Sequence, residues 1–195
     1  RALHIKADVT NREEVNDMFS TAFNEFGAVD GVVNNSSAAI TYKSFEEMSW
    51  DDMQLHIDVQ IKGSFNICKA ALPHFLKNKK GSIVNIASIY ADNVPPVKMM
   101  HYCLAKSALV SFTKSLAVEY GPLGIRVNCV SPGMTSTDMI ADIPEKAKMV
   151  NKMMTPLRQL AQPQDIAGTI SFLIGDDSKH ITGETIRVCG GQIMA

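Results

Sequence analysis

Short apolar runs alternate along the chain with longer stretches in which apolar residues recur every three or four positions. Runs of the first kind predict β-strands, and stretches of the second kind predict amphipathic helices. The predicted strands cover residues 3–9, 29–34, 81–88, 125–130 and 185–189. The predicted helices cover residues 10–26, 50–77, 102–120 and 163–174.

The first predicted helix has signals at both of its ends. Thr10 is the predicted N-cap, and Glu13 stands where a capping box needs an acidic residue. Gly27 follows the last apolar position and predicts the end of the helix.

Residues 133–156 show no regular period and contain five methionines. We therefore expect a mobile, partly helical segment there. Methionines usually fill gaps in hydrophobic cores, so a structural role for these side chains stays open beside a role in contacting a ligand.

The alternation of strands and helices predicts the fold class. It favours βαβ units, and hence an α/β protein with a parallel, doubly wound sheet in one domain over residues 1–195. Ligands of such sheets bind beyond the carboxyl ends of the strands. Polar or small residues follow the predicted strands at Asp8, at 34–37, at Ser88 and at 132–133.

Composition excludes several classes of function. The chain has 195 residues, 46% of them hydrophobic, which is enough for one buried core. Its 19 basic and 20 acidic residues offer no electrostatic attraction to nucleic acid or to an acidic membrane. No apolar run is long enough to span a membrane, and no signal peptide is recognisable, so we expect a cytoplasmic protein.

Cysteine and histidine spacing predicts no metal site. The four cysteines are far apart in sequence and form no C-x-x-C motif, so we expect buried free thiols in a reducing compartment. The five histidines show no metal-binding spacing either. His101 precedes Tyr102, and contact with a substrate is an open alternative for it.

Tyr102 and Lys106 form the sharpest local feature of the sequence. They are four residues apart in a predicted helix and therefore share one face. A neighbouring ammonium favours the phenolate, so such a tyrosine can act as an acid or base closer to neutral pH. Ser88 ends a predicted buried strand and adds a hydroxyl at the expected ligand site.

The chain resembles the short-chain dehydrogenase/reductase family, and is most similar to the 3-oxoacyl-[acyl carrier protein] reductase type. The motifs that carry the resemblance are Asp8-Val9, Asn34-Asn35-Ser36-Ser37, Asn85-Ile86-Ala87-Ser88, Tyr102-x-x-x-Lys106, Val127-Asn128-x-x-x-Pro132-Gly133, Ile181-Thr182-Gly183-Glu184-Thr185 and Gly190-Gly191. They occur in order along the whole chain, and they imply a Rossmann-like sheet and an NADP or NAD cofactor.

The resemblance implies a catalytic role for four residues. Tyr102 would protonate a carbonyl oxygen, and Ser88 would donate a hydrogen bond to that oxygen. Lys106 would hold the nicotinamide ribose and lower the pKa of Tyr102. Gln60 stands where the family has an asparagine that takes part in a water-mediated proton relay, so the relay is uncertain here.

Further residues would bind the cofactor. Asp8 and Val9 would contact the adenine, and residues 34–36 would line the cofactor crevice. The four residues that would contact the nicotinamide carboxamide and the pyrophosphate are Pro132, Gly133, Thr135 and Thr137. Structural roles stay open: Asn34 and Asn85 can tie strand ends together, and Thr135 and Thr137 can cap a helix.

The chain departs from the family pattern at two further places. No G-x-G run is present, so the first βαβα portion of the family fold, with its phosphate-binding turn, is expected to be missing from these residues. We expect the sequence to be part of a longer chain. Ser37 replaces a glycine of the family and can crowd a cofactor slightly.

The implied function is NAD(P)-dependent interconversion of a ketone and a secondary alcohol. A 3-oxoacyl thioester is the first expected substrate, which would place the protein in fatty acid biosynthesis. Two alternatives stay open: a non-catalytic partner that dimerises or serves as a scaffold, and a reductase for a sugar or steroid. The family is commonly homotetrameric, so we expect a dimer or tetramer built on the helices at 50–77 and 102–120.

Overall fold

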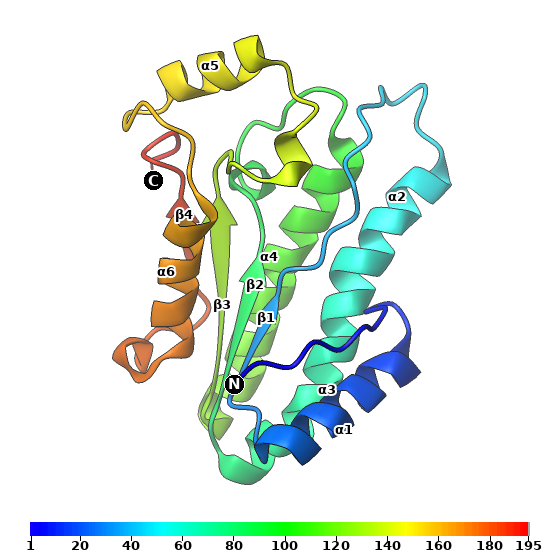
Figure 1. Cartoon of the computed structure of the whole chain (residues 1–195), viewed down its shortest axis with the longest axis vertical. Coiled ribbons are helices and arrows are strands. Elements are labelled where there is room, and N and C mark those ends of the chain that lie inside the picture. The colour runs from blue at the N-terminus through cyan, green and yellow to red at the C-terminus, as the bar shows by residue number, and fades with distance from the viewer. Residues whose placement is uncertain (195) are drawn as a thin grey trace.

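A four-stranded parallel sheet forms the centre of the structure, a computed structural model that describes residues 1–194 (Figure 1). The strands are β1 (Gly31–Asn34), β2 (Gly81–Ile86), β3 (Ile125–Pro132) and β4 (Thr185–Val188), and they pair in that order. Every residue of β2 is buried, as expected for a central strand covered on both faces.

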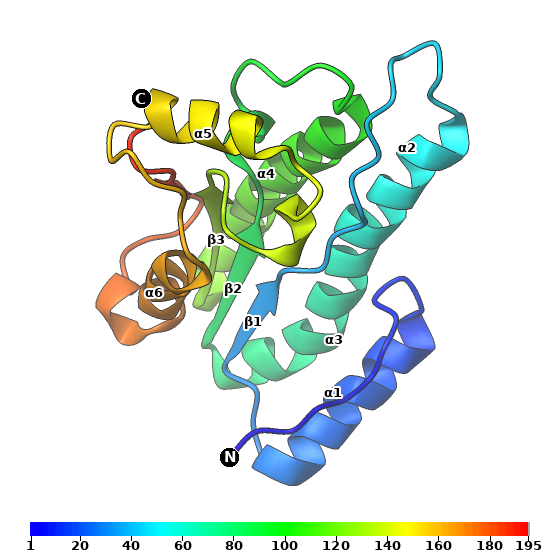
Figure 2. The same cartoon turned by 45° about the horizontal axis from the view of Figure 1, so that its top comes forward.

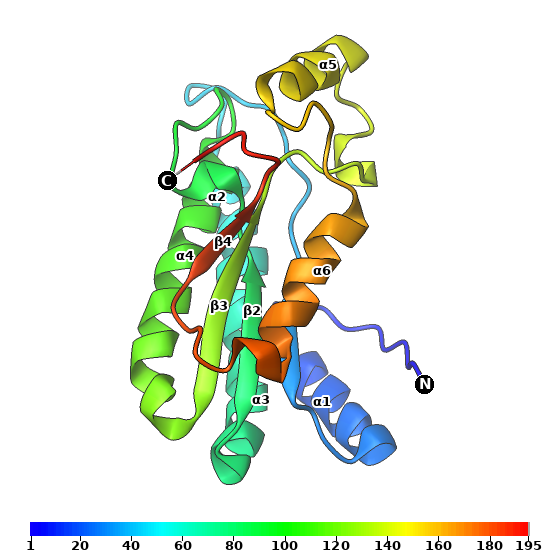
Figure 3. The same cartoon turned by 90° about the vertical axis from the view of Figure 1, so that its left-hand side faces the viewer.

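Helices cover both faces of the sheet. The helices are α1 (Arg12–Phe26), α2 (Trp50–Ile57), α3 (Gly63–Asn78), α4 (Met100–Tyr120), α5 (Glu145–Met154) and α6 (Pro163–Ile174). Figure 3 shows the sheet between α3 and α4 on one face and α6 on the other, while α1 packs on α3. This arrangement confirms the predicted α/β class. Figure 2 shows α5 across the carboxyl ends of the strands.

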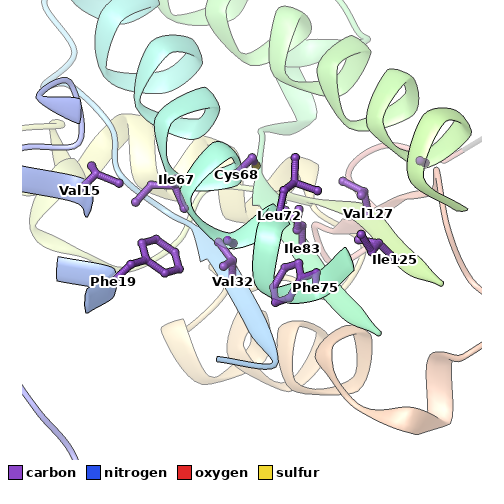
Figure 4. Packing of buried hydrophobic residues seen from close by; sticks show 12 residues of the cluster. Val15, Phe19, Val32, Ile67, Cys68, Leu72, Phe75, Ile83, Ile125 and Val127 are labelled. Atoms are coloured by element: carbon purple, nitrogen blue, oxygen red, sulfur yellow. The ribbon is translucent and has the colours of Figure 1, made fainter. Parts of the chain in front are cut away.

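The main hydrophobic core lies between α1, α3 and the first three strands (Figure 4). Phe75 of α3 is fully buried among Leu72, Ile83 and Ile125. Val15 and Phe19 of α1 extend the same cluster toward Val32 and Ile67. Burial of these side chains is the main force that holds α1 and α3 against the sheet.

Gly81 begins β2 so close to Phe75 that a side chain has no space there. A Cβ atom at Gly81 would overlap the ring carbons of Phe75. We expect Gly81→Ala to lower the free energy of unfolding by ~1–3 kcal/mol in urea titrations, the usual cost of overpacking a core. Gly168→Ala is the matched control, because that α6 position is open and alanine favours a helix. Equal effects of both changes would contradict this account.

The predicted strand at residues 3–9 is wrong. These residues form no strand and pair with none among residues 1–194. The alternation there has another physical basis, because Leu3, Ile5 and Val9 all line one cavity of about 400 Å³ beside α1 and β1. One face of the segment is therefore turned toward apolar side chains, although its backbone has no neighbouring strand.

The predicted capping box at Thr10 and Glu13 is also wrong, because the N-cap of α1 lies one residue later. Asn11 is the N-cap, and its side chain accepts hydrogen bonds from the backbone N–H groups of Glu13 and Glu14. Glu14 in turn accepts one from the Asn11 amide. Thr10 instead closes a turn in which its N–H donates to Asp8. The predicted stop at Gly27 is confirmed, with a positive φ of 81°.

The helix predicted over 50–77 contains an interruption. Ser49 and Asp52 form a capping box that begins α2, and a π-helical turn at Asp58–Lys62 separates α2 from α3. Gly63 follows this turn, where a Cβ atom would lie 2.6 Å from the Val9 side chain. The turn changes the register of the helix directly at Gln60, as π-turns often do at functional sites.

The remaining predictions agree with the structure to within about two residues at the ends of the elements. The methionine-rich segment is partly helical, as expected, with a short 3₁₀ turn at Asp138–Ile140 before α5. All four cysteines are buried free thiols, as predicted, and the reducing compartment stays a prediction. No helix within residues 1–194 combines the length and apolarity needed to cross a membrane.

Candidate active site

Tyr102 and Lys106 lie one turn apart on α4, which packs against β3 and β2. Both are nearly inaccessible, with 8% of Tyr102 and 3% of Lys106 exposed. The Lys106 ammonium lies 5.7 Å from the centre of the Tyr102 ring. It donates a hydrogen bond of 2.6 Å to the carbonyl of Ile86, the last residue of β2.

Ser88 completes this group from the end of β2. Its side chain is 5% exposed, and its hydroxyl accepts a 3.3 Å hydrogen bond from the backbone N–H of Tyr90. A second hydrogen bond joins the Ser88 and Tyr102 side chains and lowers the pKa of Tyr102. The structure therefore brings Ser88, Tyr102 and Lys106 together at the carboxyl ends of the strands.

Burial determines the protonation of this group. It raises the pKa of Tyr102, and the hydrogen bond from Ser88 opposes that effect only in part. It lowers the pKa of Lys106 to about 8. The expected lowering of the Tyr102 pKa is therefore not observed, because loss of water around the phenol dominates and Lys106 faces the Ile86 carbonyl.

Gln60 lies in the π-helical turn and is 1% exposed. Its amide nitrogen lies 3.1 Å from Nδ1 of His56 and 3.4 Å from the Ser37 hydroxyl. Its amide oxygen is buried and has no hydrogen-bond partner within residues 1–194. A buried acceptor without a partner is costly, so this oxygen is suited to a water molecule or a ligand.

Asn34, Asn35 and Ser36 end β1 with different surroundings. Asn34 is buried, and its amide donates a 2.7 Å hydrogen bond to Asn85. Asn85 in turn donates to Thr113 of α4 at 2.8 Å, which ties β1, β2 and α4 together. Asn35 and Ser36 are exposed at the carboxyl end of β1.

Pro132 and Gly133 end β3 beside β4. Gly133 donates a backbone hydrogen bond to Val188, and a Cβ atom at Gly133 would lie 3.0 Å from Cys189. Thr135 donates its hydroxyl hydrogen to the Gly133 carbonyl at 3.0 Å. Thr137 precedes the Asp138–Ile140 turn, but its side chain makes no capping hydrogen bond within the described part of the chain.

Asp8 and Val9 lie apart from this group, against α1 and α3. Asp8 is exposed, and hydrogen bonds from Thr10 lower the pKa of its carboxyl group. The Val9 carbonyl accepts a 2.9 Å hydrogen bond from Asn66 of α3. The structure therefore places Val9 in the lining of the cavity at β1, with Asp8 next to it in the chain, and neither residue beside Tyr102.

Two histidines beside Tyr102 are absent from the residues that the sequence predicts as catalytic. His56 is 1% exposed and His101 is fully buried, so neither is open to a substrate here. The His56 ring lies edge-on to both neighbours, 4.5 Å from His101 and 6.2 Å from Tyr102 between ring centres. Only the positions of His56 and Gln60, four residues apart, offered a signal in the sequence.

Comparisons with known proteins identify the family of the chain. Residues 1–192 match the family described as enoyl-(acyl carrier protein) reductase (adh_short_C2). The chain is 38% identical over 200 residues to the (2S)-[(R)-hydroxy(phenyl)methyl]succinyl-CoA dehydrogenase subunit BbsD of Thauera aromatica. That match covers all of this chain and 77% of the relative.

Two solved structures from Brucella melitensis have the same fold. A 3-oxoacyl-[acyl-carrier protein] reductase superimposes with a TM-score of 0.91 at 34% identity, over all of this chain and 73% of the other. A 3-oxoacyl-[acyl-carrier protein] reductase with bound NAD gives a TM-score of 0.88 at 33% identity, over all of this chain and 72% of the other. Together with the match over residues 1–192, these similarities show that the chain belongs to the short-chain dehydrogenase/reductase family.

Proposed function

We propose that the protein reduces a ketone to a secondary alcohol with NADPH or NADH, and that its substrate is a 3-oxoacyl thioester. The observation that carries this proposal is the group formed by Ser88, Tyr102 and Lys106 at the carboxyl ends of the strands. A hydroxyl donor, a phenol and a buried ammonium supply the contacts that a carbonyl and a ribose need.

Lys106 fits a nicotinamide cofactor. An ammonium has three donors, and the structure assigns one of them to the Ile86 carbonyl. The other two can bind the ribose hydroxyls. Asn35 and Ser36 offer exposed polar groups, and Gly133 offers backbone without a side chain, at the same end of the sheet. The bound cofactor would supply the hydride.

The reaction needs one proton besides the hydride. Tyr102 keeps its proton at neutral pH because burial raises its pKa. It can therefore transfer that proton to the carbonyl oxygen while the carbonyl carbon accepts the hydride. Ser88 donates a hydrogen bond to the same oxygen, and the phenolate that forms is stabilised by the nearby Lys106 charge.

Apolar side chains around α5 support an acyl substrate. Five residues there are more than half exposed: Met139, Met149, Met153, Met154 and Leu157. They lie on the segment that crosses the carboxyl ends of the strands (Figure 2). Flexible thioether side chains adapt to an alkyl chain better than to a polar sugar. The relatives named above act on thioesters of coenzyme A or acyl carrier protein by their names.

Turnover of three substrate types tests this proposal. The protein would be given a 3-oxoacyl thioester, a sugar lactone or ketose, and a steroid ketone, with reduced nicotinamide cofactor consumption as the readout. We expect the highest kcat/KM for the thioester. Faster reduction of the sugar or steroid would contradict the substrate class. Cofactor binding without turnover of any ketone would instead favour a non-catalytic scaffold.

Gln60→Asn tests whether the amide needs the extra methylene. We expect kcat to change by less than ~5-fold, because asparagine keeps the donor and acceptor that a bound water needs. Initial rates at saturating substrate measure this. A decrease of ~100-fold or more would show that the longer side chain of Gln60 is itself required.

We also propose a cytoplasmic homodimer or homotetramer. Large apolar side chains are exposed on the two long helical segments at Trp50, Leu55 and Phe65 and at Leu104 and Val118. Exposed apolar side chains on two helices that pack side by side favour a protein–protein interface. Light scattering in solution is expected to give twice or four times the mass of one chain. A monomer at all concentrations would contradict the proposed assembly.

A further inference from the structure

The segment that follows β1, residues 37–41, lies against side chains of α2, the π-helical turn and α4. In Figure 1 it rises from the end of β1 between α4 and α2. The Gln60 amide nitrogen lies 3.4 Å from the Ser37 hydroxyl. The backbone of Ala39 acts on the His56 ring and raises its pKa, against the effect of burial. His101 Nε2 lies 3.4 Å from the Thr41 hydroxyl.

These anchors come from two helices and the π-helical turn. His56 is on α2, Gln60 is in the turn, and His101 is on α4 directly before Tyr102. Between these contacts, Ala38 is buried and Ile40 packs against the cluster of Met99, Tyr102 and Cys103. The anchors therefore fix residues 37–41 to the helix that carries Tyr102.

The contacts of His56 define its protonation. Nδ1 of His56 lies 3.1 Å from Nε2 of Gln60, and that amide nitrogen can only donate a hydrogen bond. A neutral histidine has one N–H. The proton is therefore on Nε2, and Nδ1 accepts from the Gln60 amide.

Charged groups near the two rings are few and partly cancel. Asp52 favours the charged form of both rings, whereas Lys106 acts against it at His56 and Lys43 acts against it at His101. Lys43 and Asp52 are themselves paired at 2.7 Å. Burial and the repulsion between the two rings then keep His56 neutral, and burial keeps His101 neutral.

We propose that His56, Gln60 and His101 form a clamp that holds residues 37–41 in place. The His56 ring of this clamp also supports the Tyr102 ring through an edge-on contact. His56 and His101 are then positioning residues for the proton donor. The ring centres of His56 and His101 are 4.5 Å apart, and the ring centre of His56 lies 6.2 Å from that of Tyr102. These edge-on contacts support the Tyr102 ring. The catalytic consequence rests on the proposed function, whereas the clamp itself does not.

The first test detects the clamp by spectroscopy, in a measurement that does not depend on turnover. Side-chain ¹H–¹⁵N spectra of the whole chain would report the tautomer of each histidine, with the signals assigned from His56→Gln and His101→Gln. We expect His56 and His101 to be neutral at pH 6, with the proton of His56 on Nε2. Protonated His56 or His101 rings at pH 6, or a proton on Nδ1 of His56, would overturn the clamp.

The second test measures the position of residues 37–41 and its effect on turnover. His56→Leu removes both ring contacts, whereas His56→Gln keeps a polar amide at the same position. We expect His56→Leu to shift the backbone amides of residues 37–41 and to lower kcat by ~10-fold or more. We expect His56→Gln to retain kcat within ~3-fold, and His180→Gln, at an exposed position, to match the wild type.

The outcomes separate the two proposals. Unmoved amides at 37–41 in His56→Leu would overturn the clamp whatever happens to turnover. Shifted amides with unchanged kcat would overturn the positioning role. A wild-type chain that reduces no ketone but shows both neutral rings and the amide shifts would leave the clamp standing and remove the proposed function. If His56→Leu fails to fold, two other measurements decide whether the clamp exists. They are the tautomer of His56 in the wild type and the backbone amide positions of residues 37–41 in His56→Gln.

Discussion

Replacing Tyr102 by phenylalanine is expected to lower kcat for ketone reduction by ~10²–10⁴-fold, the usual loss when a general acid is removed. The substitution keeps the ring that packs against His56 and removes only the hydroxyl that bonds to Ser88. Lys106 keeps its hydrogen bond to the Ile86 carbonyl, so binding of the cofactor ribose is expected to remain. The loss is therefore expected in kcat, with little change in cofactor affinity.

Tyr120→Phe is the matched control for this experiment. Tyr120 is the last residue of α4 and lies at the end of the helix opposite to Tyr102. Its substitution is expected to leave turnover unchanged. Circular dichroism and urea unfolding would show that both variants are folded. Near-normal turnover by Tyr102→Phe would remove this residue from the proposed mechanism.

Acidification is expected to destabilise the protein through His56. Burial lowers the pKa of His56 from 6.5 to about 4, so between these pH values the unfolded chain binds a proton that the folded chain does not. The free energy of unfolding therefore falls as the pH falls through this window. One group with this shift accounts for a loss of about 3 kcal/mol by pH 4. His101 acts in the same direction.

His56→Gln isolates this contribution. The variant cannot titrate at that position, so its stability between pH 7 and pH 4 is expected to fall less steeply than that of the wild type. Urea titrations at a series of pH values measure the difference. Parallel slopes for His56→Gln and the wild type would contradict a neutral, buried His56.

The sequence predicted those features that depend on short-range spacing. Tyr102 and Lys106 are four residues apart in one helix, so their common face follows from helix geometry. Ser88 joined them because a parallel sheet gathers the carboxyl ends of its strands at one edge. The alternation of strands and helices along the chain also predicted the parallel sheet and the helices on both of its faces.

Features that depend on a distant partner were not predictable in this way. The segment at 3–9 has the alternation of a strand, but a strand also needs a hydrogen-bonded neighbour, and alternation reports only a buried face. Thr10 and Asn11 are both good N-cap residues, and only the turn at Asp8 decides between them. His56 and His101 are far apart in sequence, so their contact with residues 37–41 became visible only in the folded chain.

Deuterium transfer distinguishes reduction of a ketone from reduction of an enoyl double bond. The protein would receive a 3-oxoacyl thioester and a 2-enoyl thioester of equal chain length, with a reduced nicotinamide deuterated at its transferable position. Mass spectrometry would locate the label. The account predicts a 3-hydroxyacyl thioester that carries deuterium on C3, and loss of this product in Tyr102→Phe. A deuterated saturated acyl thioester from the enoyl substrate, with no hydroxyacyl product, would contradict it.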